Sequence, residues 1–136
     1  MKRLLSGISV ASLLLFTLGL AATAYAQATA SDTYLQYRKA LSTAKKVEDI
    51  FPFVSATMKK QVQSTPADQR GMMFEMMKMM SEDVTNLKVV KETRTATGAT
   101  VTVEGVGSDK SKSTGTITMV TENGGFKIEK ESWTNK

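Results

Sequence analysis

Apolar side chains between residues 31 and 83 recur every three to four positions, a spacing that predicts helices. The first helix is expected to begin within residues 31–33, where every side chain can cap free backbone amides. Thr33 followed by Gln36 fits a capping box at this start. The apolar face of this helix comprises Tyr34, Tyr37, Leu41 and Ala44.

A proline limits the second helix. Pro52 disfavours helical geometry at the residue before it, so we expect a break near residues 47–51. The second helix then begins with Pro52 in its first turn and runs to about Gln63. Its inner face is predicted to contain Val54, Met58 and Val62.

The third helix is predicted to begin at Thr65, which caps it, with Pro66 in its first turn and Asp68 closing a capping box. Six methionines lie within residues 72–80. At about 100° per residue, five of them fall within about 140°, and Met79 with Phe74 widens the apolar arc to about 220°. A helix that is apolar over more than half its circumference is buried or covers a ligand. We therefore expect the methionines to face inward.

β-Branched residues dominate the second half of the chain, and their alternation predicts four strands, at residues 87–95, 99–106, 114–121 and 126–133. Short turns, the clearest at Asn123-Gly124-Gly125, make neighbouring strands antiparallel. The expected fold is therefore α+β, with N-terminal helices packed on a curved four-stranded antiparallel meander. The predicted core faces comprise Leu87, Val89, Val101, Val103, Ile117, Met119, Phe126 and Ile128.

Trp133 has the opposite parity to Phe126 and Ile128 in the fourth strand. Either a bulge shifts this side chain inward or it covers the outer face of the sheet. Alternation alone leaves both alternatives open.

The first 26 residues have the three parts of a secretory signal peptide: Lys2 and Arg3, an apolar run over residues 4–20, and the small-residue exit Ala24-Tyr25-Ala26. An uncleaved anchor is the rival interpretation, but seventeen residues with two glycines and four hydroxyls are short and weak for a span. We expect cleavage after Ala26, a periplasmic or secreted protein without stable membrane insertion, and one α+β domain over residues 27–136.

Composition removes several functions. The 136 residues include no Cys and no His, which excludes disulfides, Cys/His zinc sites and thiolate or imidazole catalysis. The formal charge of +5 falls when the leader's two basic residues are removed, and the remaining lysines are scattered. We therefore expect no nucleic-acid partner, because such binding needs a concentrated basic face with stacking aromatics. No cofactor is expected.

Two kinds of chemistry stay open as alternatives. Thioethers are soft ligands that select copper(I), but Met72, Met76 and Met80 climb about 12 Å along a helix, so one ion can touch only two of them. A third ligand would have to come from Met58 or Met119. An acid/base enzyme would need a buried acid opposite a tyrosine, yet no carboxylate of the strand half is predicted to lie alone on a core face.

The helix carrying Tyr34-Leu-Gln-Tyr37 and the ending Gly124-Gly-Phe-Lys-Ile-Glu-Lys-Glu-Ser-Trp133 resemble the cystatin-like fold of nuclear transport factor two and ketosteroid isomerase. The closest resemblance is to small secreted bacterial lumazine-binding-like domains of unknown function. It implies a bent sheet wrapped around a helix with a pocket between them, and a sheet face that can form a homodimer. Members include enzymes, ligand binders and interaction modules, so the fold selects no function.

We expect a non-enzymatic module that binds a small apolar ligand or a protein partner. A periplasmic copper(I) carrier and a small acid/base enzyme resembling ketosteroid isomerase are the alternatives. Helical phase and strand parity place eight side chains around the expected cleft: Tyr34, Tyr37, Met73, Met77, Val101, Ile117, Met119 and Phe126.

Overall fold

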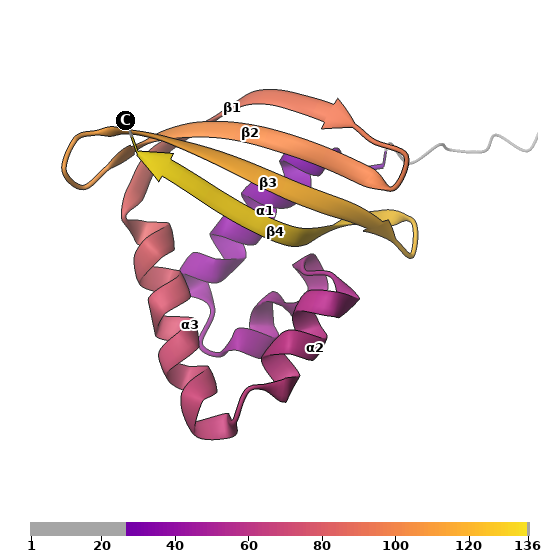
Figure 1. The fold of residues 1–136 in the computed structure, drawn as a ribbon, viewed down its shortest axis with the longest axis vertical. Helices are drawn as coiled ribbons and strands as arrows, with labels where there is room; N and C mark the ends of the chain where they lie inside the picture. The colour runs from indigo at the N-terminus through magenta and orange to yellow at the C-terminus, as the bar shows by residue number, and fades with distance from the viewer. Residues whose placement is uncertain (1–26, 136) are drawn as a thin grey trace, which may run out of the picture.

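The computed structural model describes residues 27–135, so the predicted signal peptide lies outside the described residues. Four helical segments come first, followed by four strands (Figure 1). The strands form one antiparallel sheet in the order β1-β2-β3-β4, which confirms the expected α+β fold. The elements are α1 (Ala30–Thr43), the 3-10 helix η1 (Val47–Phe53), α2 (Ala56–Ser64), α3 (Ala67–Glu82), β1 (Val84–Arg94), β2 (Gly98–Gly107), β3 (Lys112–Glu122) and β4 (Gly125–Asn135).

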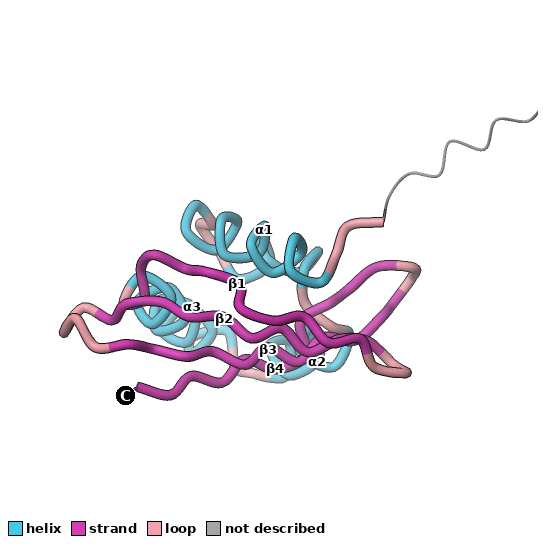
Figure 2. Tube along the Cα trace, turned by 90° about the horizontal axis from the view of Figure 1, so that it is seen from above, coloured by secondary structure: helices cyan, strands magenta, loops and turns pink. Residues whose placement is uncertain are grey.

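All the helices lie on one side of the sheet, which arches over α1, while α2 and α3 extend away from the strands (Figure 1). Seen from above, α1 runs along the β1 side of the sheet (Figure 2). The open side of this arrangement is bordered by β4, an edge strand that has only β3 as a neighbour in the sheet.

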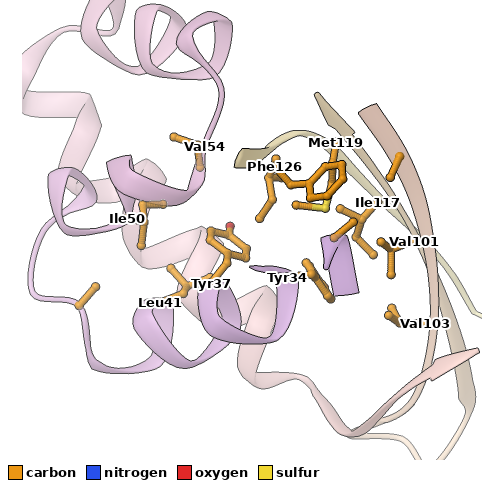
Figure 3. Close-up of a cluster of buried hydrophobic side chains, with 14 of the residues drawn as sticks. Tyr34, Tyr37, Leu41, Ile50, Val54, Val101, Val103, Ile117, Met119 and Phe126 are labelled. Atoms are coloured by element: carbon orange, nitrogen blue, oxygen red, sulfur yellow. The ribbon is translucent and has the colours of Figure 1, made fainter. Parts of the chain in front are cut away.

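The core lies between α1, η1 and the inner face of the sheet. Side chains from α1 and from the central strands point toward one another, among them Tyr34, Val101 and Ile117, each with none of its surface exposed (Figure 3). Alternate positions of β2 and β3 are buried. Successive side chains of a strand point to opposite faces of the sheet, so the residues at every second position share the inner face. The predicted core faces of β2, β3 and β4 are therefore confirmed, while Leu87 and Val89 of β1 are half-buried.

The start of α1 differs from the prediction. Thr29 caps the helix: the amide of Asp32 donates to the Thr29 hydroxyl (3.0 Å) and the Thr29 amide donates to the Asp32 carboxylate (3.3 Å). The predicted box at Thr33 and Gln36 is wrong, because the chain turns helical four residues earlier and Thr33 donates to the Thr29 carbonyl instead. A hydroxyl three residues before an acid supplies this cap.

The second helix is interrupted by a contact with the sheet. Pro52 lies inside η1, and α2 begins only after Ser55, whose hydroxyl accepts from the Met58 amide (3.1 Å). Between the two helices, Val54 is extended and forms a parallel bridge with Ile128 of β4, and the Ser55 amide donates to the Ile128 carbonyl (2.9 Å). Pairing with the β4 edge thus replaces helical hydrogen bonds at this point.

The prediction that Thr65 caps α3 is wrong, because Thr65 is the C-cap of α2. Its hydroxyl donates to the Gln61 carbonyl (3.1 Å), and Pro66 occupies the N-cap position of α3 without a side-chain bond. Arg70 in α3 donates to the carbonyls of Thr65 and Gln63, both at 2.8 Å. Arg70 of α3 thus satisfies the Gln63 carbonyl in the last turn of α2 and the carbonyl of the C-cap residue Thr65, which fixes the corner between the two helices.

A β-bulge interrupts the pairing of β3 with β4. Thr118 pairs with Lys130 and Met119 pairs with Ile128, which leaves Glu129 without a partner. The extra residue reverses the alternation, so that Trp133 lies opposite Gly115 and packs against the core. Of the two alternatives for Trp133, the inward bulge is confirmed.

Candidate functional site

A cleft of about 300 Å³ lies where α1, α2 and α3 meet the C-terminal half of β4. Its wall is mainly apolar, and the exceptions are Ser81 and one carboxylate, Glu131. The lining residues are Tyr37 and Leu41 of α1, Met58 of α2, Met73, Met77, Met80 and Ser81 of α3, and Glu131 and Trp133 of β4.

A second hollow of about 100 Å³ lies toward η1. Met58, Met73 and Met77 line both hollows. Methionine side chains are unbranched and have three rotatable bonds, so rotation of these three can change how the space is divided. The cleft can therefore adjust its depth without a movement of the backbone.

Glu131 forms the polar end of the cleft. Its Oε1 accepts hydrogen bonds from the Tyr34 hydroxyl and from the Trp133 indole nitrogen, each at 2.7 Å, and lies 3.5 Å from the Arg38 guanidinium. The Glu131 side chain is 20% exposed. Within residues 27–135, its Oε2 has no hydrogen-bond partner. One carboxylate oxygen is thus held by the protein while the other is available to a ligand.

Arg38 connects this carboxylate to the end of α3. Its guanidinium donates to the carbonyls of Ser81 and Val84 and to the Tyr34 hydroxyl (3.3 Å), and lies 5.7 Å from the centre of the Trp133 ring. Only 9% of the side chain is exposed. A buried cation needs a partner of opposite charge, and Glu131 is that partner for Arg38. The Arg38–Glu131 pair therefore has no net charge.

The two tyrosines of α1 stay protonated. Burial raises the pKa of Tyr34 and of Tyr37 far above the usual range for phenols, and the negative charge of Glu131 raises both further, while Arg38 opposes this in part. Tyr34 donates its proton to Glu131. Tyr37 brings a neutral phenol to the wall of the cleft.

Three of the eight side chains predicted to line a cleft do so: Tyr37, Met73 and Met77. Tyr34 is buried beneath the cleft and reaches it through its hydrogen bond to Glu131. The remaining four belong to the core and are at most 5% exposed: Val101, Ile117, Met119 and Phe126.

Sequence reasoning missed Glu131 and Trp133. The bulge at Glu129 turns both inward, so the expectation that no strand carboxylate lies on the inner face is wrong. The only signal in the sequence is the odd parity of Trp133, a large aromatic residue on a strand face that alternation assigns to solvent.

The expectation that the methionines of α3 face inward is wrong for four of the six. Met72, Met76, Met79 and Met80, called here the methionine patch, are between 54% and 72% exposed. Phe74, only 3% exposed, takes the inward side of α3 instead. Since α3 extends away from the sheet, its outer half has no strand to cover it (Figure 1).

Comparisons with protein-family models, with curated proteins and with solved structures find no match for this chain. Over residues 27–135, no helix has the length and apolar character that a membrane crossing requires.

Proposed function

We propose that this protein is a non-enzymatic periplasmic or secreted module whose cleft binds a small apolar ligand. The observation that carries the proposal is the apolar cleft of about 300 Å³ that ends at a single available carboxylate oxygen of Glu131. A concave apolar site with few placed polar groups is the usual form of a small-molecule site. The resemblance to the nuclear-transport-factor-two-like fold belongs to this proposal, because that fold places a pocket between its helices and its sheet.

The polar end of the cleft favours one kind of ligand. The Arg38–Glu131 pair is neutral as a whole, so a charged ligand group would stay uncompensated there. Oε2 of Glu131 can accept a hydrogen bond but cannot donate one while ionised. The ligand we propose is therefore an uncharged molecule with an apolar body and one donor, such as a hydroxyl or an N–H group.

The same geometry disfavours acid/base catalysis. An isomerase-like site needs a carboxylate base and a separate donor that stabilises the developing oxyanion. Tyr34, the phenol beside Glu131, donates its proton to that carboxylate and is not free for a substrate. Tyr37 is the remaining phenol on the wall of the cleft, and binding requires no proton transfer from either tyrosine.

The test uses N-phenyl-1-naphthylamine, a neutral apolar fluorophore with one N–H donor. We expect the protein to bind this probe with a rise in fluorescence, and Met77→Trp to abolish binding because the larger side chain fills the cleft. Met72→Trp is the matched control, since it makes the same change on the exposed side of the same helix. Equal binding by the two variants, with circular dichroism showing that both are folded, would overturn the proposal.

Glu131→Gln tests the anchor separately, because the amide keeps the shape of the side chain but brings a donor beside the ligand's own donor. We expect weaker probe binding than in the parent protein. The location is tested by the mass of the protein isolated from the periplasm or the medium, which we expect to begin at Gln27. An intact leader on the isolated protein would contradict secretion.

A further inference from the structure

The methionine patch places four thioethers in solvent on one face of α3. The exposed fractions are 72% for Met72, 54% for Met76, 65% for Met79 and 62% for Met80. An exposed patch of large apolar side chains on a small protein marks an interaction site of some kind. These side chains do not fill the core, so their sulfur atoms are accessible to a ligand from solvent.

The spacing within the patch brings three sulfur atoms within reach of one point. Met79 and Met80 follow Met76 by three and four residues, and side chains at these separations are neighbours on a helix, with Cβ atoms about 5–6 Å apart. Each methionine has three rotatable bonds with which to adjust the position of its sulfur. One ion can touch only two of the methionines spaced four residues apart, such as Met76 and Met80, and Met79 supplies the third ligand.

The two other methionines considered from sequence as a third ligand lie elsewhere. Met58 lines the cleft, on α2, and Met119 is 2% exposed in the core of the sheet. Neither belongs to the outer face of α3. The patch is therefore complete within one helix and independent of the tertiary packing of the sheet.

The charges around the patch favour a cation. Met76, Met79 and Met80 lie in the C-terminal half of α3, where the helix dipole presents its negative end. Glu75, Glu82 and Asp83 are exposed along the same stretch. Acids at three and four residues from a methionine lie beside it on the helix surface. This field disfavours an anionic membrane as the occupant.

The nearest base does not cancel that field. The Lys78 ammonium donates to the Ala44 carbonyl (3.2 Å) and lies 5.7 Å from the centre of the Phe74 ring, so it is held on the inner side of α3. The outer side keeps soft sulfur donors surrounded by carboxylates.

We propose that Met76, Met79 and Met80 bind one copper(I) ion through their three thioether sulfurs. Neutral, soft thioethers select copper(I) over harder cations such as magnesium and calcium, which require oxygen ligands. Within residues 27–135, no three His, Cys, Asp or Glu side chains converge to hold a metal. Met80 also borders the cleft, whereas Met76 and Met79 do not line it, and the proposal does not depend on the ligand proposed for the cleft.

The test is an anaerobic titration of the mature protein with copper(I), kept reduced by ascorbate, against a chromophoric copper(I) chelator. We expect one equivalent to bind, and a first coordination shell of sulfur alone by X-ray absorption. Absence of copper(I) uptake, or a shell of nitrogen and oxygen, would overturn the proposal.

The key variant replaces Met76, Met79 and Met80 together by leucine, which keeps apolar bulk and helix propensity but removes sulfur. Because changes even outside the first shell cost about 10–100-fold in metal affinity, we expect a loss of at least about 100-fold. The matched control replaces Met58, Met73 and Met77 by leucine, which removes three sulfurs from the cleft instead, and we expect its affinity to stay at the parent value. Equal loss in both variants would refute the assignment.

Silver(I), a soft ion that needs no reductant, gives a reading without any substitution. In the protein labelled with ¹³C at the methionine methyl groups, we expect silver(I) to shift the signals of the proposed ligands and to leave that of the buried Met119 in place. Shifts confined to Met58, Met73 and Met77 would contradict the proposal.

Discussion

The buried tyrosines of α1 make stability depend steeply on pH in the alkaline range. Tyr34 and Tyr37 are 0% and 2% exposed, and burial with the nearby Glu131 raises the pKa of both phenols well above that of an exposed tyrosine. In the unfolded chain both titrate near the reference value of about 10. Above that pH the unfolded state releases protons that the folded state keeps, so the free energy of unfolding falls as the pH rises.

The size of the effect follows from linkage. One pKa unit is worth about 1.36 kcal/mol, so at pH of about 11.5 each tyrosine contributes a loss of about 2 kcal/mol, and the two together about 4 kcal/mol. Such a loss is a large part of the stability of a small domain, about 5–15 kcal/mol. At neutral pH the tyrosines contribute no pH dependence.

The assay is urea unfolding at a series of pH values from 9 to 11.5, for the protein produced as residues 27–136 and for its Tyr37→Phe variant. We expect the variant to lose stability about half as steeply from this source, because one of the two phenols is gone. Deprotonation of lysines affects both proteins alike, so the difference between the two curves isolates Tyr37.

Phenolate absorbance near 295 nm supplies the refutation. In a chain that begins at Gln27, the only tyrosines are the buried pair. We expect no phenolate signal until the protein unfolds. A signal that rises near pH 10 while circular dichroism still reports the folded state, or equal slopes for the two proteins, would refute the reasoning.

Two further predictions concern a strand glycine and the oxidation of methionine. Gly115→Ala would place a Cβ 2.9 Å from the Trp133 ring and 2.9 Å from a methyl carbon of Val103, so we expect a loss of about 1–3 kcal/mol in urea unfolding. Gly71→Ala is the control, since nothing lies within 4 Å of its Cβ, and we expect a gain of up to about 1 kcal/mol; a loss at both positions would contradict the packing argument. Under dilute hydrogen peroxide, peptide mass mapping should find sulfoxide in the methionine patch well before Met119, and simultaneous oxidation would contradict the described exposure.

The strands could be predicted from the sequence because their signals are local. Val101 and Val103 on β2 and Ile117 and Met119 on β3 alternate without interruption, and the turn at Asn123-Gly124 fixes the register of the last hairpin. The order of helices before strands likewise follows from composition alone.

The cleft could not be predicted, because its decisive features depend on pairing in three dimensions. The bulge at Glu129 adds one residue to β4, and periodicity does not report where such an addition falls. The prediction of the orientation of α3 was wrong for a different reason. A helix with an apolar arc of about 220° can bury its apolar side chains in several orientations, and the packing of Phe74 selects one of them. Side chains that a uniform pattern leaves equivalent are separated only by contacts with other elements.

Because of the extra residue at Glu129, the deletion and the insertion of one codon at this point of β4 would have different effects on the lining of the cleft. Losing that codon would restore regular pairing and still leave Glu131 opposite Ile117. Gaining one codon beside it would bring Lys130 and Ser132 to the inner face in place of Glu131 and Trp133, and an acidic end would become a basic one. A single in-frame insertion would thus reverse the charge at the polar end of the cleft, while the helices that form its other walls keep their sequence.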